Sequence, residues 1–133
     1  RDLAPKLEAA AAPAPVVPLN TVYFIPMPNQ RAAQAVAALF NSEPMRAFAY
    51  TLGERARGGW RRHFAWVMRL LPVPQRLVDM LAADAAVGAP SADRGSEVVD
   101  RWAGEFYGLT PESVERLRQW RTGRRQAGLA EVA

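Results

Sequence analysis

The chain has 133 residues, half of them hydrophobic, which is enough to bury a core of its own and form one domain. It has no cysteine and one histidine, which excludes a disulfide framework, a thiolate metal site and a zinc site built from several histidines. Lys and Arg outnumber Asp and Glu by 17 to 13, and every cation except Lys6 is an arginine. A GC-rich coding genome produces such a skew, but guanidinium groups also bind phosphates and guanine edges well.

No apolar run approaches the roughly 18–20 residues of a membrane span, so we expect no membrane partner. The absence of cysteine favours the cytoplasm. Because the sequence does not begin with Met, we expect it to be a segment of a longer protein. The Ala- and Pro-rich residues 1–18 predict an extended linker.

Residues 21–25 (TVYFI) are β-branched and aromatic and precede Pro26, which predicts a strand. Asn29 is the expected cap of a helix over 30–40, whose apolar residues recur at helical spacing. Ser42 is the expected cap of a second helix, which runs to about Leu52 and is ended by the glycines that follow.

Residues 60–74 fit more than one pattern. We expect a short strand at 60–63, a short helix at 64–70 and an extended segment at 71–74. Helices are then expected at 75–86 and 96–107, with a loop between them.

Thr110 and Pro111 form a strong start signal for the last helix, which we expect to fray beyond Gly123. The predicted fold class is therefore α+β and mostly helical, with strands near 21–25 and 60–63 and about five helices. We divide it into a linker (1–18), an α+β segment (19–74), a small helical bundle (75–123) and a flexible tail (124–133).

Two groups of side chains have simple structural interpretations. We expect the aromatic residues of the second half to pack in the core and between helices: Trp66, Trp102, Phe106, Tyr107 and Trp120. We expect its carboxylates to lie on solvated helix faces: Asp79, Asp84, Asp93, Glu97, Asp100 and Glu105. No Ser, Cys or Asp near His63 in the sequence lies in a recognisable nucleophile motif, and no glycine-rich phosphate loop follows the strand at 21–25. The chain alone therefore has no predicted catalytic residues and no metal site.

The positive charge is concentrated in one stretch. Residues 46–76 contain seven arginines and one acid, Glu54. Arginines there could neutralise phosphates, the paired glycines would let the backbone approach a polyanion, and Trp60 and His63 could stack on a base or a sugar. A solvated basic hairpin is the alternative. The candidate nucleic-acid-binding residues are Arg55, Arg57, Gly58, Gly59, Trp60, Arg61, Arg62 and His63.

Four motifs occur in an order that resembles the C-terminal target-recognition region of large adenine-specific DNA methyltransferases of restriction–modification and phage-defence systems. They are PLNTVYFIP at 18–26, ALFNS at 38–42, GGWRR at 58–62 and LPVP at 71–74. The string RWAGEFYGLTPE at 101–112 is similar to the closing helices of these enzymes, although Glu105-Phe106 stands where the family usually has a Leu before the Tyr.

The resemblance implies a part that recognises DNA without performing the chemistry. The family's Asn-Pro-Pro-Tyr/Phe motif and its S-adenosylmethionine loop are both missing here, so we expect no cofactor in this chain and S-adenosylmethionine in the catalytic part. The implied partners are double-stranded DNA and a methyltransferase catalytic domain or subunit. A helical protein–protein adaptor that docks a partner through residues 75–121 remains the alternative.

Overall fold

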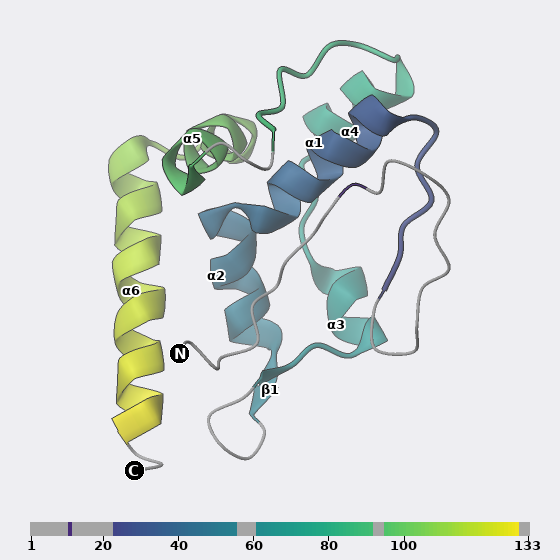
Figure 1. Cartoon of the computed structure of the whole chain (residues 1–133). Helices are drawn as coiled ribbons and strands as arrows, with labels where there is room; N and C mark the ends of the chain where they lie inside the picture. The colour runs from purple at the N-terminus through teal and green to yellow at the C-terminus, as the bar shows by residue number, and fades with distance from the viewer. Residues whose placement is uncertain (1–10, 12–22, 56–60, 92–94, 131–133) are drawn as a thin grey trace.

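The computed structural model describes residue 11 and residues 23–55, 61–91 and 95–130. These residues form six helices and one two-stranded ribbon (Figure 1), which confirms the predicted α+β, mostly helical class. The elements in chain order are α1 (Gln30–Asn41), α2 (Glu43–Leu52), β1 (Glu54–Arg55), β2 (Arg61–Arg62), α3 (Ala65–Leu70), α4 (Gln75–Ala82), α5 (Ser96–Tyr107) and α6 (Pro111–Ala130).

The corner between α1 and α2 is built from short polar side chains. Asn29 caps α1, because its Oδ1 accepts a hydrogen bond from the backbone N–H of Ala32 at 2.8 Å. Ser42 occupies the cap position of α2 as predicted, but its hydroxyl donates backwards to the carbonyl of Leu39 at 2.6 Å. The cap hydrogen bond comes instead from Asp100, whose Oδ1 accepts the N–H of Glu43 at 2.6 Å.

The core lies where α1 and α2 meet α5 and the segment around α4. Its largest fully buried apolar side chains are Leu39, Met45, Leu77 and Val67. Each such side chain contributes about 1.5–3 kcal/mol by leaving water. Alanines fill many of the remaining buried positions, including Ala35, Ala49 and Ala103 in the main cluster, so the helices pack closely through small residues.

The segment between α4 and α5 is held at two points. Asp84 has a φ of 53°, and its carboxylate lies 2.7 Å from Nη2 of Arg31. Trp102 donates its indole N–H to the carbonyl of Val87 at 2.8 Å. The helix predicted over 75–86 ends earlier, at Ala82.

Helix α5 ends at Gly108, whose φ of 67° is a left-handed conformation that glycine adopts without strain. The predicted start of the last helix is confirmed, since the Thr110 hydroxyl accepts the N–H of Ser113 at 3.2 Å. A hydrogen bond from its own backbone N–H and one from Thr110 lower the pKa of Glu112 in this first turn. Helix α6 continues past Gly123 to Ala130, in the part of the chain that we expected to fray.

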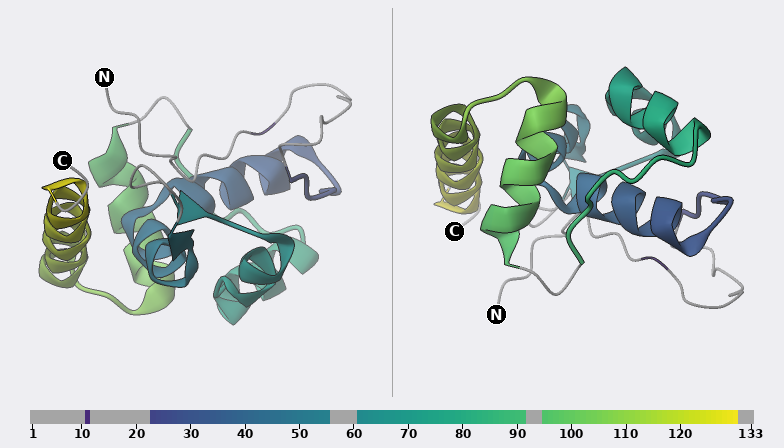
Figure 2. Two further views of the ribbon diagram at one scale, coloured as in Figure 1. Left: turned by 90° about the horizontal axis from the view of Figure 1, so that it is seen from below. Right: turned by 90° about the horizontal axis from the view of Figure 1, so that it is seen from above.

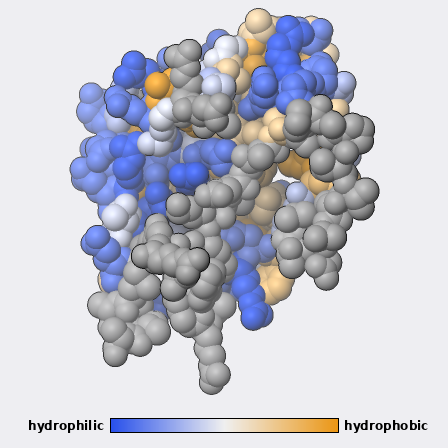
Figure 3. Space-filling model, viewed as in Figure 1, coloured by the Kyte–Doolittle hydropathy of each residue, from blue (hydrophilic) through white to orange (hydrophobic). Residues whose placement is uncertain are grey.

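Helix α6 lies at one edge of the molecule and packs against α2 and α5 (Figures 1 and 2). In the view of Figure 3, hydrophilic side chains cover α6, and apolar side chains reach the surface on the other side. Within the described ranges, no helix combines the length and apolar character needed to cross a membrane.

Three side-chain or strand predictions are wrong. Residues 23–25 form no strand, and Tyr23, Phe24 and Ile25 are all more than half exposed, because no described strand lies beside them to complete a sheet. Trp66 is 50% exposed and lies outside the core, whereas Trp102, Phe106 and Tyr107 pack against the core. Trp120 is 41% exposed but packs edge-on against Tyr50 of α2, as a helix-packing residue. Among the carboxylates expected in solvent, Asp100 is 4% exposed.

Candidate nucleic-acid interface

The basic ribbon begins where α2 ends. The N–H of Gly53 donates to the carbonyl of Ala49 at 2.8 Å, and the chain leaves the helix directly into β1. β1 and β2 pair antiparallel with Glu54 opposite Arg62 and Arg55 opposite Arg61. The strand predicted at 60–63 is thus present as Arg61–Arg62, with a partner strand that the sequence did not reveal.

His63 connects this ribbon to α2. Its Nε2 lies 3.3 Å from the carbonyl oxygen of Ala49, the same oxygen that accepts from Gly53. A carbonyl can only accept, so Nε2 is the protonated ring nitrogen in this contact. His63 therefore links the end of β2 to α2. Its partner in this contact is a backbone carbonyl and not a nucleophile that it could activate.

The structure describes only part of the predicted site. Arg55 and Arg62 are exposed on the ribbon, and the backbone of Arg61 lies in β2 opposite Arg55. Arg57, Gly58, Gly59 and Trp60 fall outside the described residues.

The remaining arginines of the 46–76 stretch do not share one surface. Arg69 is exposed in the last turn of α3, the helix that follows the ribbon. Arg76 points toward α5, where its Cζ lies 5.7 Å from the centre of the Phe106 ring. Arg46 lies in α2, and in the described part of the chain its Nε is buried without a hydrogen-bond partner. The sequence could not show which of these arginines face the same surface, because a count of charges does not say where each side chain points.

Exposed aromatic side chains follow the ribbon along the chain. Phe64 is 38% exposed and Trp66 is 50% exposed. The exposure of Trp66 contradicts its expected place in the core. The spacing in α3 could have predicted this exposure, because Trp66, Arg69 and Leu70 share one side of the helix. Val67 and Met68 together define the side that faces the core.

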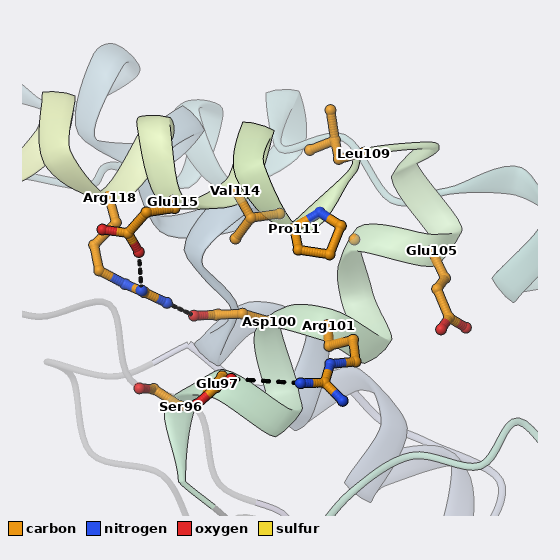
Figure 4. Close-up of a pocket in the computed structure, with 11 residues that line it drawn as sticks. Ser96, Glu97, Asp100, Arg101, Glu105, Leu109, Pro111, Val114, Glu115 and Arg118 are labelled. Carbon is orange, nitrogen blue, oxygen red and sulfur yellow. Dashed lines mark hydrogen bonds and ion pairs between the residues drawn. The ribbon is translucent and has the colours of Figure 1, made fainter.

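A groove of about 670 Å³ lies between α5 and α6 (Figure 4). Its charged side chains are largely paired with one another. Arg118 bridges Asp100, at 2.5 Å, and Glu115, while Arg101 lies 3.4 Å from Glu97. The hydrogen bond with Asp100 raises the pKa of Arg118. Figure 4 shows Glu105 directed away from these pairs.

This groove offers little for catalysis. Asp100 and Glu115 are both engaged by the same guanidinium, so they do not form an acid and base pair facing a substrate. Among the described residues, no group of three His, Cys, Asp or Glu side chains could hold a metal ion. The paired charges join α5 to α6, and the exposed arginines of the ribbon remain the better candidate for binding a ligand.

Comparisons of this chain with protein-family models, with curated proteins and with solved structures found no significant match.

Proposed function

We propose that this chain binds double-stranded DNA as the target-recognition part of an adenine-specific DNA methyltransferase. The observation that carries the proposal is the exposed basic ribbon. Arg55 and Arg62 are exposed on adjacent strands, and residues 55–78 contain six arginines without one Asp or Glu. Such a surface suits a phosphate backbone, which arginine side chains and backbone N–H groups commonly contact.

The motif order that resembles these methyltransferases supports the same function. An enzyme that methylates a base must take it out of the stack, so a separate part of the protein has to hold the duplex and choose the site. Methyl transfer and S-adenosylmethionine binding would then belong to a catalytic domain or subunit outside these residues. A cytoplasmic restriction–modification or phage-defence system is the setting that this proposal implies.

The test is duplex binding by a variant that removes three arginines of the candidate site, Arg57→Gln with Arg61→Gln and Arg62→Gln (the ribbon variant). Binding to a labelled duplex is followed by fluorescence anisotropy over a range of salt concentrations. If all three side chains contact phosphates, the slope of log affinity against log salt falls by about 2–3, since each phosphate contact contributes about 0.9. Affinity falls at every salt concentration.

A matched control carries the same loss of charge on α5 and α6, as Arg101→Gln with Arg116→Gln and Arg124→Gln. These three arginines are exposed and lie outside the ribbon. We expect the control to keep most of the affinity and nearly the whole salt slope. Unchanged binding in the ribbon variant, or an equal loss in the control, would contradict the proposed site.

The protein–protein adaptor is the second candidate. Val78, Val98 and Trp120 are each more than 40% exposed, on α4, α5 and α6. Their positions on three helices favour an adaptor only if a partner covers them together. An adaptor would bind a protein partner and show no salt-dependent DNA affinity. The anisotropy experiment therefore separates the two functions.

A further inference from the structure

The helix after the ribbon exposes apolar and cationic side chains together. In α3, Val67 is fully buried and Met68 packs against the core. Trp66, Arg69 and Leu70, spaced three and four residues apart, share the opposite side and are all exposed. Trp66 is 50% and Leu70 is 55% exposed. We call the exposed set Arg62, Phe64, Trp66, Arg69 and Leu70 the α3 face.

The local backbone explains why Arg62 and Phe64 belong to this set. The chain is extended through Phe64, whose ψ is 164°, so residues two apart point to the same side. His63 points to the carbonyl of Ala49 on α2. Its neighbours Arg62 and Phe64 therefore point away from α2, and both are exposed.

The charge on this face indicates the kind of partner. It carries two arginines, and no acid occurs in the sequence between Glu54, the cross-strand neighbour of Arg62, and Asp79. A purely apolar patch would suit many proteins, whereas cations beside exposed aromatic rings form the combination that holds a nucleic-acid strand: arginines meet the phosphates and rings stack on bases. Stacking requires bases that are free of the duplex stack.

We propose that the α3 face binds unpaired nucleotides, with Trp66 stacking on a base and Arg62 and Arg69 contacting the adjoining phosphates. This inference rests on the proposed DNA binding and extends it, since the ribbon would hold the duplex while the α3 face accepts nucleotides displaced from it. Helix α3 is suited to this task because Val67 fixes it to the core and leaves the Trp66 side free.

The experiment compares three labelled probes by fluorescence anisotropy: an intact duplex, the same duplex with a central bulge of unpaired nucleotides, and one of its single strands. Stacking of one base on an aromatic side chain corresponds to about a fivefold or larger gain in affinity. We expect the wild-type chain to bind the bulged duplex at least that much more tightly than the intact one.

Trp66→Ala should remove this preference and weaken binding of the single strand while leaving affinity for the intact duplex nearly unchanged. Trp66→Phe, which keeps an aromatic ring, should retain most of the preference. Trp120→Ala is the matched control, because Trp120 is also exposed but lies on α6, where its ring meets Tyr50 edge-on at 6.0 Å. Circular dichroism of each variant shows whether the fold is kept.

The outcomes separate this inference from the proposed function. Equal affinity of the wild-type chain for all three probes, or a bulge preference that survives Trp66→Ala, overturns the inference and leaves duplex binding by the ribbon standing. Loss of binding to a methyltransferase catalytic chain in Trp66→Ala, with DNA binding unchanged, identifies the α3 face as a protein interface and also overturns it. Binding of the single strand through Trp66 without any binding of the intact duplex supports the α3 face and contradicts the proposed function.

Discussion

The carboxylate of Asp100 on α5 accepts the backbone N–H of Glu43, the first residue of α2, at 2.6 Å. Both residues are buried, at 4% and 3% exposure. The second oxygen of Asp100 accepts from Nη2 of Arg118 on α6 at 2.5 Å. One side chain therefore caps α2 and pairs with α6, and three helices depend on it.

Removing this carboxylate should destabilise the fold strongly. Asp100→Ala leaves the buried N–H of Glu43 without an acceptor and takes away a partner of Arg118, so we expect a loss of about 3 kcal/mol in the free energy of unfolding. Urea denaturation followed by circular dichroism measures it. Asp79→Ala is the control, because Asp79 is exposed and its carboxylate accepts a hydrogen bond from Gln75, one turn away on the same helix; it should cost less than about 0.5 kcal/mol.

The ion pair between Glu43 and Arg121 gives a second prediction. Nε and Nη2 of Arg121 donate to the two carboxylate oxygens at 2.5 and 2.9 Å, and this hydrogen bonding raises the pKa of Arg121. Either single change, Glu43→Met or Arg121→Met, leaves a charge of low exposure without its partner and should cost about 2–4 kcal/mol.

The double variant Glu43→Met with Arg121→Met should recover most of that loss, because no unpaired charge remains and the two thioether chains can pack together. Urea denaturation of all four proteins closes a double-mutant cycle, and we expect a coupling of at least about 1.5 kcal/mol. If the losses in the free energy of unfolding from the two single changes simply added up in the double variant, the ion pair would contribute no coupling to the stability of the fold.

These long-range contacts mark what the sequence could not predict. Helix starts were predictable because their signals are local: Asn29 caps α1 and Thr110 caps α6 within three residues along the chain. The burial of Asp100 depends on Glu43, which is 57 residues away in the sequence, and an isolated Asp on an amphipathic helix has no such signal. The strand prediction for residues 23–25 was wrong for a similar reason, because a strand is stable only where a partner strand lies beside it.

The candidate site also combines features that the local sequence predicts with features that depend on distant residues. The strand at Arg61–Arg62 and the helix after it follow from local pattern, and so does the concentration of arginine. The partner strand Glu54–Arg55 could not be predicted from local pattern. Glu and Arg are not among the residues that favour strands, and these two residues take their conformation from the pairing with β2. The exposure of Trp66 was missed because a tryptophan is usually buried. Its place on the side of α3 that faces away from Val67 and Met68 corrects that expectation.

Tyr107 should make stability depend on pH in the alkaline range. Its hydroxyl donates to the carbonyl of Pro72 at 2.7 Å, and burial raises its pKa from 10.0 to about 12. Since the unfolded chain ionises first, the stability from this group is present below pH 10 and is lost as pH rises toward 12.

Tyr107→Phe should therefore cost about 1 kcal/mol near neutral pH, from the lost hydrogen bond. The advantage of the wild-type chain over this variant should shrink between pH 10 and 12, because the variant has no phenol to ionise at this position. Urea midpoints of the two proteins across this range measure the difference. A constant difference would mean that the phenol ionises alike in the folded and unfolded chains.

Two helical glycines should respond to alanine in opposite directions. Gly123 lies within α6, where an added Cβ would meet nothing within 4 Å, so Gly123→Ala should stabilise the fold by about 0.5–1 kcal/mol through helix propensity. Gly104 lies in α5, where a Cβ would approach Cγ2 of Val114 to 3.3 Å and the carbonyl oxygen of Leu109 to 3.4 Å.

Crowding at Gly104 should outweigh the same gain in propensity. Val114 is 5% exposed and β-branched, so its side chain has little freedom to move, and the Leu109 backbone is held by a 2.8 Å hydrogen bond to the carbonyl of Gly104. We expect Gly104→Ala to destabilise the fold by about 1 kcal/mol. Thermal denaturation of both variants beside the wild-type chain measures the contrast. Stabilisation by Gly104→Ala would show that α6 can move away from α5 at little cost, whereas destabilisation by Gly123→Ala would mean that α6 does not continue as a helix through this position.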